Sequence, residues 1–366
     1  MSFDHRHYVP CLRWKQGEYQ AVLRLSGATK KMFTPLIEVP EIGWDFENEV
    51  ESKTIDEHLA PFARRVVEKW GRRPCFIDLP FIRPNELMAT NLHPVHFVFD
   101  ELRVRKCPAI PVTGLDRDNA YQREIRDVVT RNKYGLCLRI KIEQAAKGTL
   151  KDNLASALSR LKVKPENCDL IFDLGAPNFV PLEGFSTVIQ QIVSKLPYLN
   201  NWRTFTVLGA AFPETMASIR QGLQIVPRYE WQLYKKIIAS FRKSKMRLPS
   251  FGVCAICHPK VLFVDMRIAK PSATIRYTIN NNWYIAKGQN VRDYGFRQYR
   301  ELSRQIQNSR HWCGRSFSWG DEYIQECANG RGSTGNLTTW RKVGTNHHIV
   351  KVIRGIASFY ASSSSR

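Results

Sequence analysis

Carboxylates follow three short apolar runs at the point where each run ends. Glu38, Asp78 and Asp173 are each preceded by two or three apolar residues, which places them at the ends of predicted strands. Three carboxylates brought together can hold Mg²⁺ or Mn²⁺, or divide the roles of general acid and general base when burial separates their pKa values. The sequence therefore predicts a metal-dependent or acid–base site formed by these three residues.

Basic residues also stand at the ends of predicted strands. Lys15, Arg139 and Lys141 lie just inside or beyond their strands. In an active site we expect Lys15 and Lys141 to take part in catalysis beside the carboxylates, with Arg139 binding an anionic group. The alternative is a salt-bridged network that closes the site and carries out no chemistry, because such networks also occur in proteins that are not enzymes.

One cysteine motif has metal-ligand spacing. Cys254-Ala255-Ile256-Cys257-His258 matches the spacing of c-type haem attachment, and Cys-x-x-Cys also begins many zinc sites. Haem attachment requires an oxidising, exported setting that the N-terminal residues do not indicate, so we expect no haem. A zinc site stays open, although the remaining histidines and cysteines lack the usual paired spacing. Buried thiols are the simpler interpretation.

The charge of the chain favours an anionic partner. Lys and Arg number 55 against 33 Asp and Glu, which gives a net charge of +22. From residue 251 onward, 17 basic residues stand against 6 acidic ones, so positive charge is denser there than in the rest of the chain. Such a field attracts nucleic acid, another polyanion or an acidic protein. A basic protein without such a partner is the simpler alternative.

Basic and aromatic side chains alternate in the C-terminal third. Nucleic-acid sites use Arg and Lys for phosphates and aromatic faces for unpaired bases. The alternative is that the aromatic residues form the core of this region while the basic residues are solvated. The residues that we expect to bind the anion, together with Arg139, are Arg276, Arg297, Arg300, Arg304, Arg315, Arg341, Trp340 and His348.

Short apolar runs alternate with helical patterns over the first 258 residues. Each run is bounded by Pro, Gly or charged residues and is too short for a good helix. Eight strands with a helix in nearly every interval match a (β/α)8 TIM-type barrel of the α/β class. A doubly wound sheet is less favoured, because no Gly-rich turn follows the first strand. The predicted strands are residues 8–14, 33–39, 75–79, 109–113, 135–140, 170–174, 204–208 and 251–256.

This alternation ends near residue 259. Residues 274–278 and 283–286 read as a hairpin, with an Asn-rich turn between them. Residues 293–307 are predicted to form a helix with one apolar stripe, and residues 348–360 to form a closing helix. The C-terminal part is therefore expected to combine strands and helices.

The predicted organisation has two parts and a tail. A (β/α)8 barrel spans residues 1–258, and a basic, aromatic-rich α+β extension packed on the barrel spans residues 259–361. Residues 362–366 are expected to be disordered. Because no stretch approaches the ~20 apolar residues of a membrane helix and no secretory signal is visible, we expect a cytoplasmic protein without membrane contact.

Six short segments occur in a distinctive order along the chain. They are YVPCLRWKQGE at 8–18, TPLIEVP at 34–40, IRYT at 275–278, SWGD at 318–321, GNLTTWR at 335–341 and NHH at 346–348. Together they resemble the beta protein family of tailed phages and bacteria. The resemblance implies a phage–host conflict setting, because members occur in phages and in bacterial gene neighbourhoods that resemble mobile elements or defence islands. It supplies no catalytic residues.

These observations together predict a phage or antiphage-defence component. We expect it to bind nucleic acid or another phosphorylated ligand through its basic C-terminal surface. One alternative is a hydrolase of phosphodiesters or nucleotides that uses Mg²⁺ or Mn²⁺ at the barrel mouth. Another is a subunit of a defence complex that binds an acidic protein partner and has no catalytic activity. The fold alone does not decide among these functions.

Overall fold

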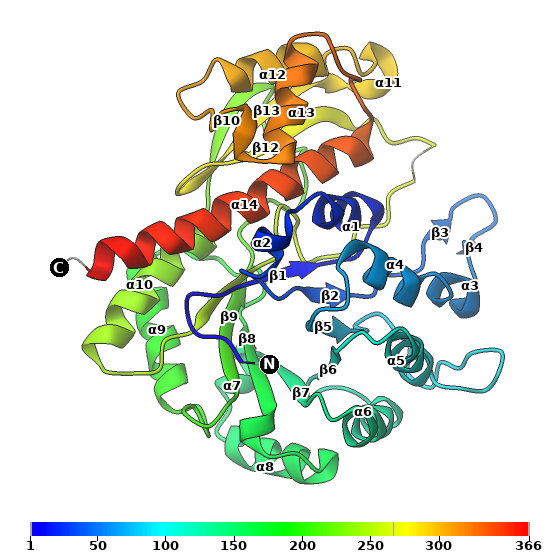
Figure 1. The fold of residues 1–366 in the computed structure, drawn as a ribbon, viewed down its shortest axis with the longest axis vertical. Helices are drawn as coiled ribbons and strands as arrows, with labels where there is room; N and C mark the ends of the chain where they lie inside the picture. Colours follow the sequence, from blue (N-terminus) through cyan, green and yellow to red (C-terminus); the bar gives the residue numbers. More distant parts are fainter. Residues whose placement is uncertain (1, 266, 365–366) are drawn as a thin grey trace.

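Eight parallel strands form a closed barrel in the order β1-β11-β9-β8-β7-β6-β5-β2 (Figure 1). The structure is a computed structural model that describes residues 2–265 and 267–364. Each of the eight predicted strands has its counterpart, so the predicted barrel is confirmed. The strands are β1 (Tyr8–Leu12), β2 (Leu36–Glu38), β5 (Cys75–Asp78), β6 (Ala109–Thr113), β7 (Leu136–Lys141), β8 (Cys168–Asp173), β9 (Thr204–Gly209) and β11 (Ser250–Val253).

Helices lie around the outside of the barrel and connect its strands. The helix predicted over residues 55–70 is divided in two, because Pro61 has no N–H to continue the helical hydrogen bonds. A small hairpin of β3 (Trp44–Asp45) and β4 (Val50–Glu51) precedes this pair. The helices are α1 (Gln16–Leu23), α2 (Gly27–Lys30), α3 (Ile55–Leu59), α4 (Phe62–Lys69), α5 (Pro94–Val104), α6 (Asn119–Asn132), α7 (Ile142–Ala145), α8 (Leu150–Leu161), η1 (Pro165–Asn167), α9 (Leu182–Ser194) and α10 (Tyr229–Lys243).

The C-terminal region contains a three-stranded antiparallel sheet. The predicted hairpin is present as β12 (Ser272–Thr278) and β13 (Asn282–Asn290), and a third strand, β10 (Gly222–Pro227), pairs with β13. Sequence analysis missed β10, which lies between β9 and α10 in the chain. Gly295, at φ +66°, separates the two helices found where one was predicted. The helices of this region are α11 (Val291–Tyr294), α12 (Tyr299–Gln307), η2 (Arg315–Phe317) and α13 (Trp319–Ala328).

The long helix α14 (Leu337–Ser364) belongs to both parts of the molecule. Its first half packs on β12, α13 and α1, and its second half runs across the barrel toward α10 (Figure 1). There Ile356 and Tyr360 are buried in the barrel core, and Tyr360 is hydrogen-bonded to Tyr234 of α10 at 2.9 Å. Because α14 lies between α10 and α1, it covers the wall that an eighth barrel helix would cover. Residues 365–366 of the tail predicted to be disordered lie outside the described residues.

Two glycines allow α14 to approach its neighbours closely. A Cβ on Gly17 of α1 would lie 2.6 Å from Cγ of Arg341, and one on Gly344 would lie 2.9 Å from the carbonyl oxygen of Arg276 in β12. Side chains at these two positions would push the helix away from α1 and β12. In the described part of the chain, no helix is both long and apolar enough to cross a membrane.

Candidate functional site

The three predicted carboxylates converge at the barrel mouth, where they surround an arginine. Arg139 of β7 donates from Nη1 to Glu38 at 2.6 Å and to Asp78 at 3.0 Å, and from Nε to Asp173 at 2.7 Å. We call these four residues the arginine–carboxylate cluster. The three carboxylates lie close together, as predicted from their positions at strand ends. Arg139, however, was predicted to bind an anionic ligand. In the structure its guanidinium is bound by the protein itself.

Further contacts complete the charge balance of the cluster. Arg117 donates to the second oxygen of Asp78 at 2.7 Å, and the N–H of Gly175 donates to Asp173 at 2.8 Å. Burial raises the pKa of Asp78, while Arg117 and Arg139 oppose that rise. Burial lowers the pKa of Arg139, but the carboxylates outweigh it and raise this pKa well above its ordinary value. The cluster therefore matches the salt-bridged network.

The contacts of these carboxylates leave little support for a divalent cation at the mouth. Within residues 2–265 and 267–364, no group of three or more His, Cys, Asp or Glu side chains is arranged to hold a metal ion. Glu38 and Asp173 share the guanidinium of Arg139 rather than a common cavity. Mg²⁺ or Mn²⁺ would have to compete with this cation for the same oxygens.

The two predicted catalytic lysines lie away from the cluster. Lys15 bonds to Glu41, and Lys141 donates to Asp116 at 2.7 Å. More than half of each lysine side chain is exposed to solvent. The structure therefore does not bring either lysine together with the three carboxylates.

The Cys-x-x-Cys-His segment forms hydrogen bonds instead of a ligand set. The thiol of Cys257 donates to Glu18 at 3.1 Å and accepts from Arg341 at 2.9 Å. Burial raises the pKa of Cys257 to about 12, so the thiol is protonated at neutral pH. Cys254 is buried against Cys11 on the inner side of the barrel. These contacts fit the interpretation of buried thiols rather than zinc ligands.

Two residues predicted to bind an anion lie in the protein interior. Trp340 is 3% exposed, and its ring stacks on Tyr299 at a centroid distance of 4.4 Å. His348 is completely buried, with Nδ1 at 2.9 Å from the hydroxyl of Thr278 and Nε2 at 3.3 Å from the hydroxyl of Tyr8. Trp340 packs on α12 and α13, and His348 joins α14 to β1 and β12, so both side chains belong to the core. The structure corrects the prediction for both.

The other predicted anion-binding arginines occupy three different places. Arg297, Arg300 and Arg304 are exposed near or on α12, and Arg304 also donates to a carbonyl at the end of α13. Arg315 pairs with Glu322 at 3.0 Å, so part of its charge is neutralised. The remaining two, Arg276 and Arg341, line a small cavity at the barrel mouth.

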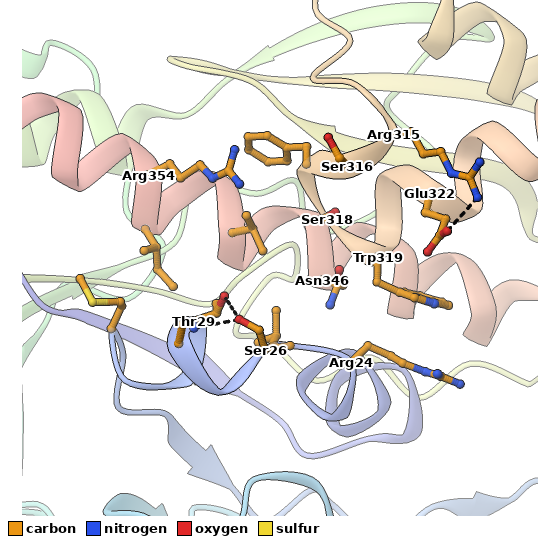
Figure 2. Close-up of a pocket in the computed structure, with 16 residues that line it drawn as sticks. Arg24, Ser26, Thr29, Arg315, Ser316, Ser318, Trp319, Glu322, Asn346 and Arg354 are labelled. Carbon is orange, nitrogen blue, oxygen red and sulfur yellow. Dashed lines mark hydrogen bonds and ion pairs between the residues drawn. The ribbon is translucent and has the colours of Figure 1, made fainter.

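A large cavity lies beside α14 (Figure 2). Its volume is about 870 Å³, and we call it the α14 groove. One wall comes from α2 and the end of α1, and the other comes from η2, α13 and α14. Its lining includes Arg24, Ser26, Thr29, Arg315, Phe317, Ser318, Trp319, Glu322, Asn346 and Arg354.

Cations lie over the two aromatic rings of this groove. Over Trp319, Cζ of Arg24 is 5.6 Å and Nζ of Lys342 is 4.2 Å from the ring centroid (Figure 2 shows Arg24 extending below the indole). Over Phe317, Nζ of Lys351 is 5.7 Å and Cζ of Arg354 is 4.2 Å from the centroid. These distances are typical of cation–π contacts.

These four cations lack acidic partners in the described structure. Across residues 2–265 and 267–364, no Asp or Glu forms an ion pair with Arg24, Lys342, Lys351 or Arg354. Burial lowers the pKa of Lys342, and the nearby charge of Arg24 lowers it further. Arg24 and Arg354 in the groove lining, with Lys342 and Lys351 against its aromatic rings, therefore carry positive charge without an ion pair, which favours an anionic ligand.

A buried polar network holds the two aromatic rings in place. Asp321 of α13 accepts hydrogen bonds from Ser318 at 2.5 Å and Tyr277 at 2.7 Å, and lies 2.9 Å from Nδ1 of His347 on α14. Burial raises the pKa of Asp321, but His347 and these hydrogen bonds outweigh it and lower that pKa below its ordinary value. The network ties α13 and β12 to α14 and so fixes the position of Trp319.

A second cavity continues the groove on the other side of Phe317. Its volume is about 440 Å³, and it shares Phe317 and Arg354 with the α14 groove. Trp231 lines this cavity, with Nζ of Lys235 at 6.0 Å from its ring centroid. The pattern of an aromatic ring beside a cation thus recurs along both cavities.

Of the residues predicted to bind an anion, Arg315 lines the α14 groove. The alternation of basic and aromatic residues includes Phe317 and Trp319, yet the arginines chosen as ligands lie mostly elsewhere. Arg24 belongs to the first barrel helix and reaches Trp319 only through the tertiary fold. The sequence carries no local signal for such a contact.

Comparison with known proteins gives a family and no curated counterpart. The family model described as Beta protein matches residues 8–354. No curated protein matches the chain.

Proposed function

The chain belongs to the Beta protein family, and we propose that it binds single-stranded nucleic acid through the α14 groove as part of phage–host conflict. One observation carries the proposal. Arg24, Lys342, Lys351 and Arg354 surround two aromatic rings and have no acidic partner among the described residues. Phosphates supply the missing negative charge, and aromatic rings offer stacking contacts to unpaired bases.

The charge of the whole molecule supports the same ligand class. A net charge of +22 draws a polyanion toward the protein from a distance, and the groove then provides local contacts. The second cavity, which meets the groove at Phe317 and Arg354, gives a strand a path beyond a single nucleotide.

The contacts at the barrel mouth argue against hydrolysis and leave binding as the favoured function. Each carboxylate of the arginine–carboxylate cluster is engaged by a guanidinium, which leaves no free acid–base pair there. A hydrolase of phosphodiesters or nucleotides is therefore the weaker candidate. An acidic protein partner would use the same cations, but it would not use the aromatic rings for stacking.

Binding of a fluorescently labelled single-stranded oligonucleotide, measured by anisotropy across a salt series, tests the proposal. Four phosphate contacts predict that log affinity falls with log salt with a slope of about 3, at roughly 0.7 per phosphate. Changing Arg24→Gln and Lys342→Gln together should lower this slope by about 1.4. Arg160→Gln, an exposed arginine on α8, is the matched control and should leave the slope unchanged.

A further pair of variants separates stacking from charge. Trp319→Leu keeps an apolar side chain but removes the indole, and should cost about 1–3 kcal/mol of binding free energy if a base stacks there. If the salt dependence of binding were the same in the Arg24→Gln/Lys342→Gln variant as in the unmodified protein, the proposal would be contradicted. Equal affinity for a duplex, with no effect of Trp319→Leu, would assign the groove to a backbone-only contact instead.

A further inference from the structure

A third cavity, lined by basic residues, lies between the barrel mouth and the C-terminal region. It is separate from the α14 groove and from the cavity lined by Trp231. Its volume is about 240 Å³. It lies beyond the ends of β9 and β11, which are the seventh and eighth strands of the barrel. In barrels of this type the loops after these two strands frequently form a phosphate site. Its basic lining residues are Arg13, Lys15, Lys260, Arg276 and Arg341, and its acidic ones are Glu18, Glu41 and Glu214. Phe212 and Cys257 also line it.

Arg276 of β12 carries a positive charge that the protein does not balance. Its Nε is buried and has no hydrogen-bond partner, and none of the described acidic residues forms an ion pair with it. Its guanidinium lies 5.5 Å from the ring centroid of Phe212. Arg341 lines the same cavity, and its charge adds to burial in lowering the pKa of Arg276.

Arg341 of α14 is held in place from two sides. Its Nη1 donates to the carbonyl of Ile256 at 3.0 Å and to the thiol of Cys257 at 2.9 Å. Gly17 leaves room for the aliphatic part of this side chain, because a Cβ there would lie 2.6 Å from its Cγ. The arginine is therefore fixed before any ligand arrives.

The acidic residues of the cavity are engaged elsewhere. Glu41 bonds to Lys15, and Glu214 pairs with Lys260 at 2.7 Å. Glu18 accepts from Cys257, and burial raises the pKa of its carboxyl group and so favours its neutral form. None of the three forms an ion pair with the two arginines. Keeping two half-buried guanidinium groups in one cavity without an anion is costly.

We propose that this cavity binds a phosphate monoester, with Arg276 and Arg341 as its ligands. Two guanidinium groups offer planar, fixed donors that match the oxygens of a phosphate dianion. The volume suits a phosphate with a small organic group and lies below the range of sites for larger ligands. The monoester comes either from a small metabolite or nucleotide, or from the phosphorylated end of a strand.

The full-length protein is tested first with inorganic phosphate at constant ionic strength, with thermal unfolding as the readout. Phosphate should raise the unfolding temperature of the unmodified protein in a saturable manner. Arg276→Met should remove this rise, with an apparent Kd at least about tenfold higher. Arg160→Gln, far from the cavity, should respond like the unmodified protein. The proposal would be overturned if phosphate did not raise the unfolding temperature of the unmodified protein, or if it raised that of Arg276→Met by the same amount.

Arg341→Gln provides a second variant in case Arg276→Met does not fold. It keeps a hydrogen-bonding group beside Ile256 and removes the charge, so phosphate should again bind at least about tenfold more weakly. Unchanged phosphate binding in Arg341→Gln would also contradict the proposal. The groove variant Arg24→Gln/Lys342→Gln should keep the full phosphate response, so the failure of one site can be told from the failure of the other.

Two probes distinguish the source of the monoester. A nucleoside monophosphate that competes with inorganic phosphate assigns the cavity to a small phosphorylated molecule. An oligonucleotide with a 5′-phosphate that competes, while its 5′-hydroxyl counterpart and the mononucleotide do not, assigns it to a strand end. Competition by the 5′-hydroxyl strand equal to that of the 5′-phosphorylated strand would overturn recognition of a monoester.

Discussion

At the barrel mouth the guanidinium of Arg139 binds three carboxylates, whereas beside α14 four cations lie over aromatic rings and form no ion pair with a described carboxylate. In the first region each charge is satisfied by the protein, which makes the mouth a structural element. In the second region the charge is left for a partner. Sequence composition counts both regions as basic, so it is the pairing of charges, rather than their number, that separates stability from binding.

The largest expected effect comes from breaking the arginine–carboxylate cluster. Arg139→Met removes the cation that the three carboxylates share and leaves Asp173 without a guanidinium, while Asp78 keeps Arg117 and Glu38 keeps only Arg13 at 3.9 Å. We expect a loss of about 3–5 kcal/mol in the free energy of unfolding at pH 7, because a buried charge without its partner is strongly destabilising. Urea denaturation measures this loss.

Lys141→Met is the control for this variant. It breaks the exposed pair with Asp116 and should cost less than about 1 kcal/mol. A cost for Arg139→Met as small as that of the control would show that the cluster contributes little to the fold. Mg²⁺ or Mn²⁺ should not raise the unfolding temperature of the unmodified protein, and a clear rise would restore the metal-dependent alternative.

The second prediction concerns the junction of the two regions, where His348 bonds to Tyr8 of the barrel and Thr278 of the C-terminal sheet. Burial lowers the pKa of His348 well below 6.5. Above pH 6.5 the imidazole is neutral in both folded and unfolded chains. Below it, the unfolded chain binds a proton that the folded chain does not, so stability falls by about 1.4 kcal/mol per pH unit.

Comparison of the unmodified protein with His348→Gln isolates this contribution. The variant cannot bind the proton, so the difference in unfolding free energy between the two proteins should change between pH 6.5 and pH 5.5 by about 1 kcal/mol, because the unfolded imidazole is already half protonated at pH 6.5. The other titrating groups cancel in the difference. A constant difference across this range would mean that His348 binds its proton equally well in the folded chain.

The smallest expected effect on stability comes from the groove cations. Arg24→Met and Lys342→Met remove charges that have no described acidic partner, so each should change the free energy of unfolding by no more than about 0.5 kcal/mol. Nucleic-acid binding should weaken in both variants. Destabilisation close to that of Arg139→Met would remove the contrast between the two regions.

The sequence allowed much of the barrel to be predicted. Its eight strands are short apolar runs bounded by turn residues, a pattern that depends only on local sequence. The convergence of Glu38, Asp78 and Asp173 followed from the rule that strand ends meet at one face of a parallel barrel. The same rule placed Arg139 at this face, but the choice between ligand binding and salt bridging depends on distances of a few ångströms, which no local pattern encodes.

Elements that depend on distant partners were missed. β10 is a half-exposed strand that pairs with β13, about sixty residues later in the chain. The helix α14 begins eleven residues earlier than predicted, because Thr338, Thr339 and Gly344 are poor helix formers that packing on α1 and β12 overrides. Trp340 and His348 seemed available to a ligand for the same reason, since their burial depends on where α14 packs.

The position of α14 also governs how the chain reaches its native state during synthesis. The helix covers β1, the first strand of the barrel to be synthesised, and contacts such as that between Tyr8 and His348 span 340 residues. Closing so long a loop is slow, and the apolar wall between α10 and α1 remains uncovered until it happens. Nascent chains that stop before α14 therefore expose a barrel with one wall open, a substrate for chaperones and proteases rather than a shorter version of the same protein.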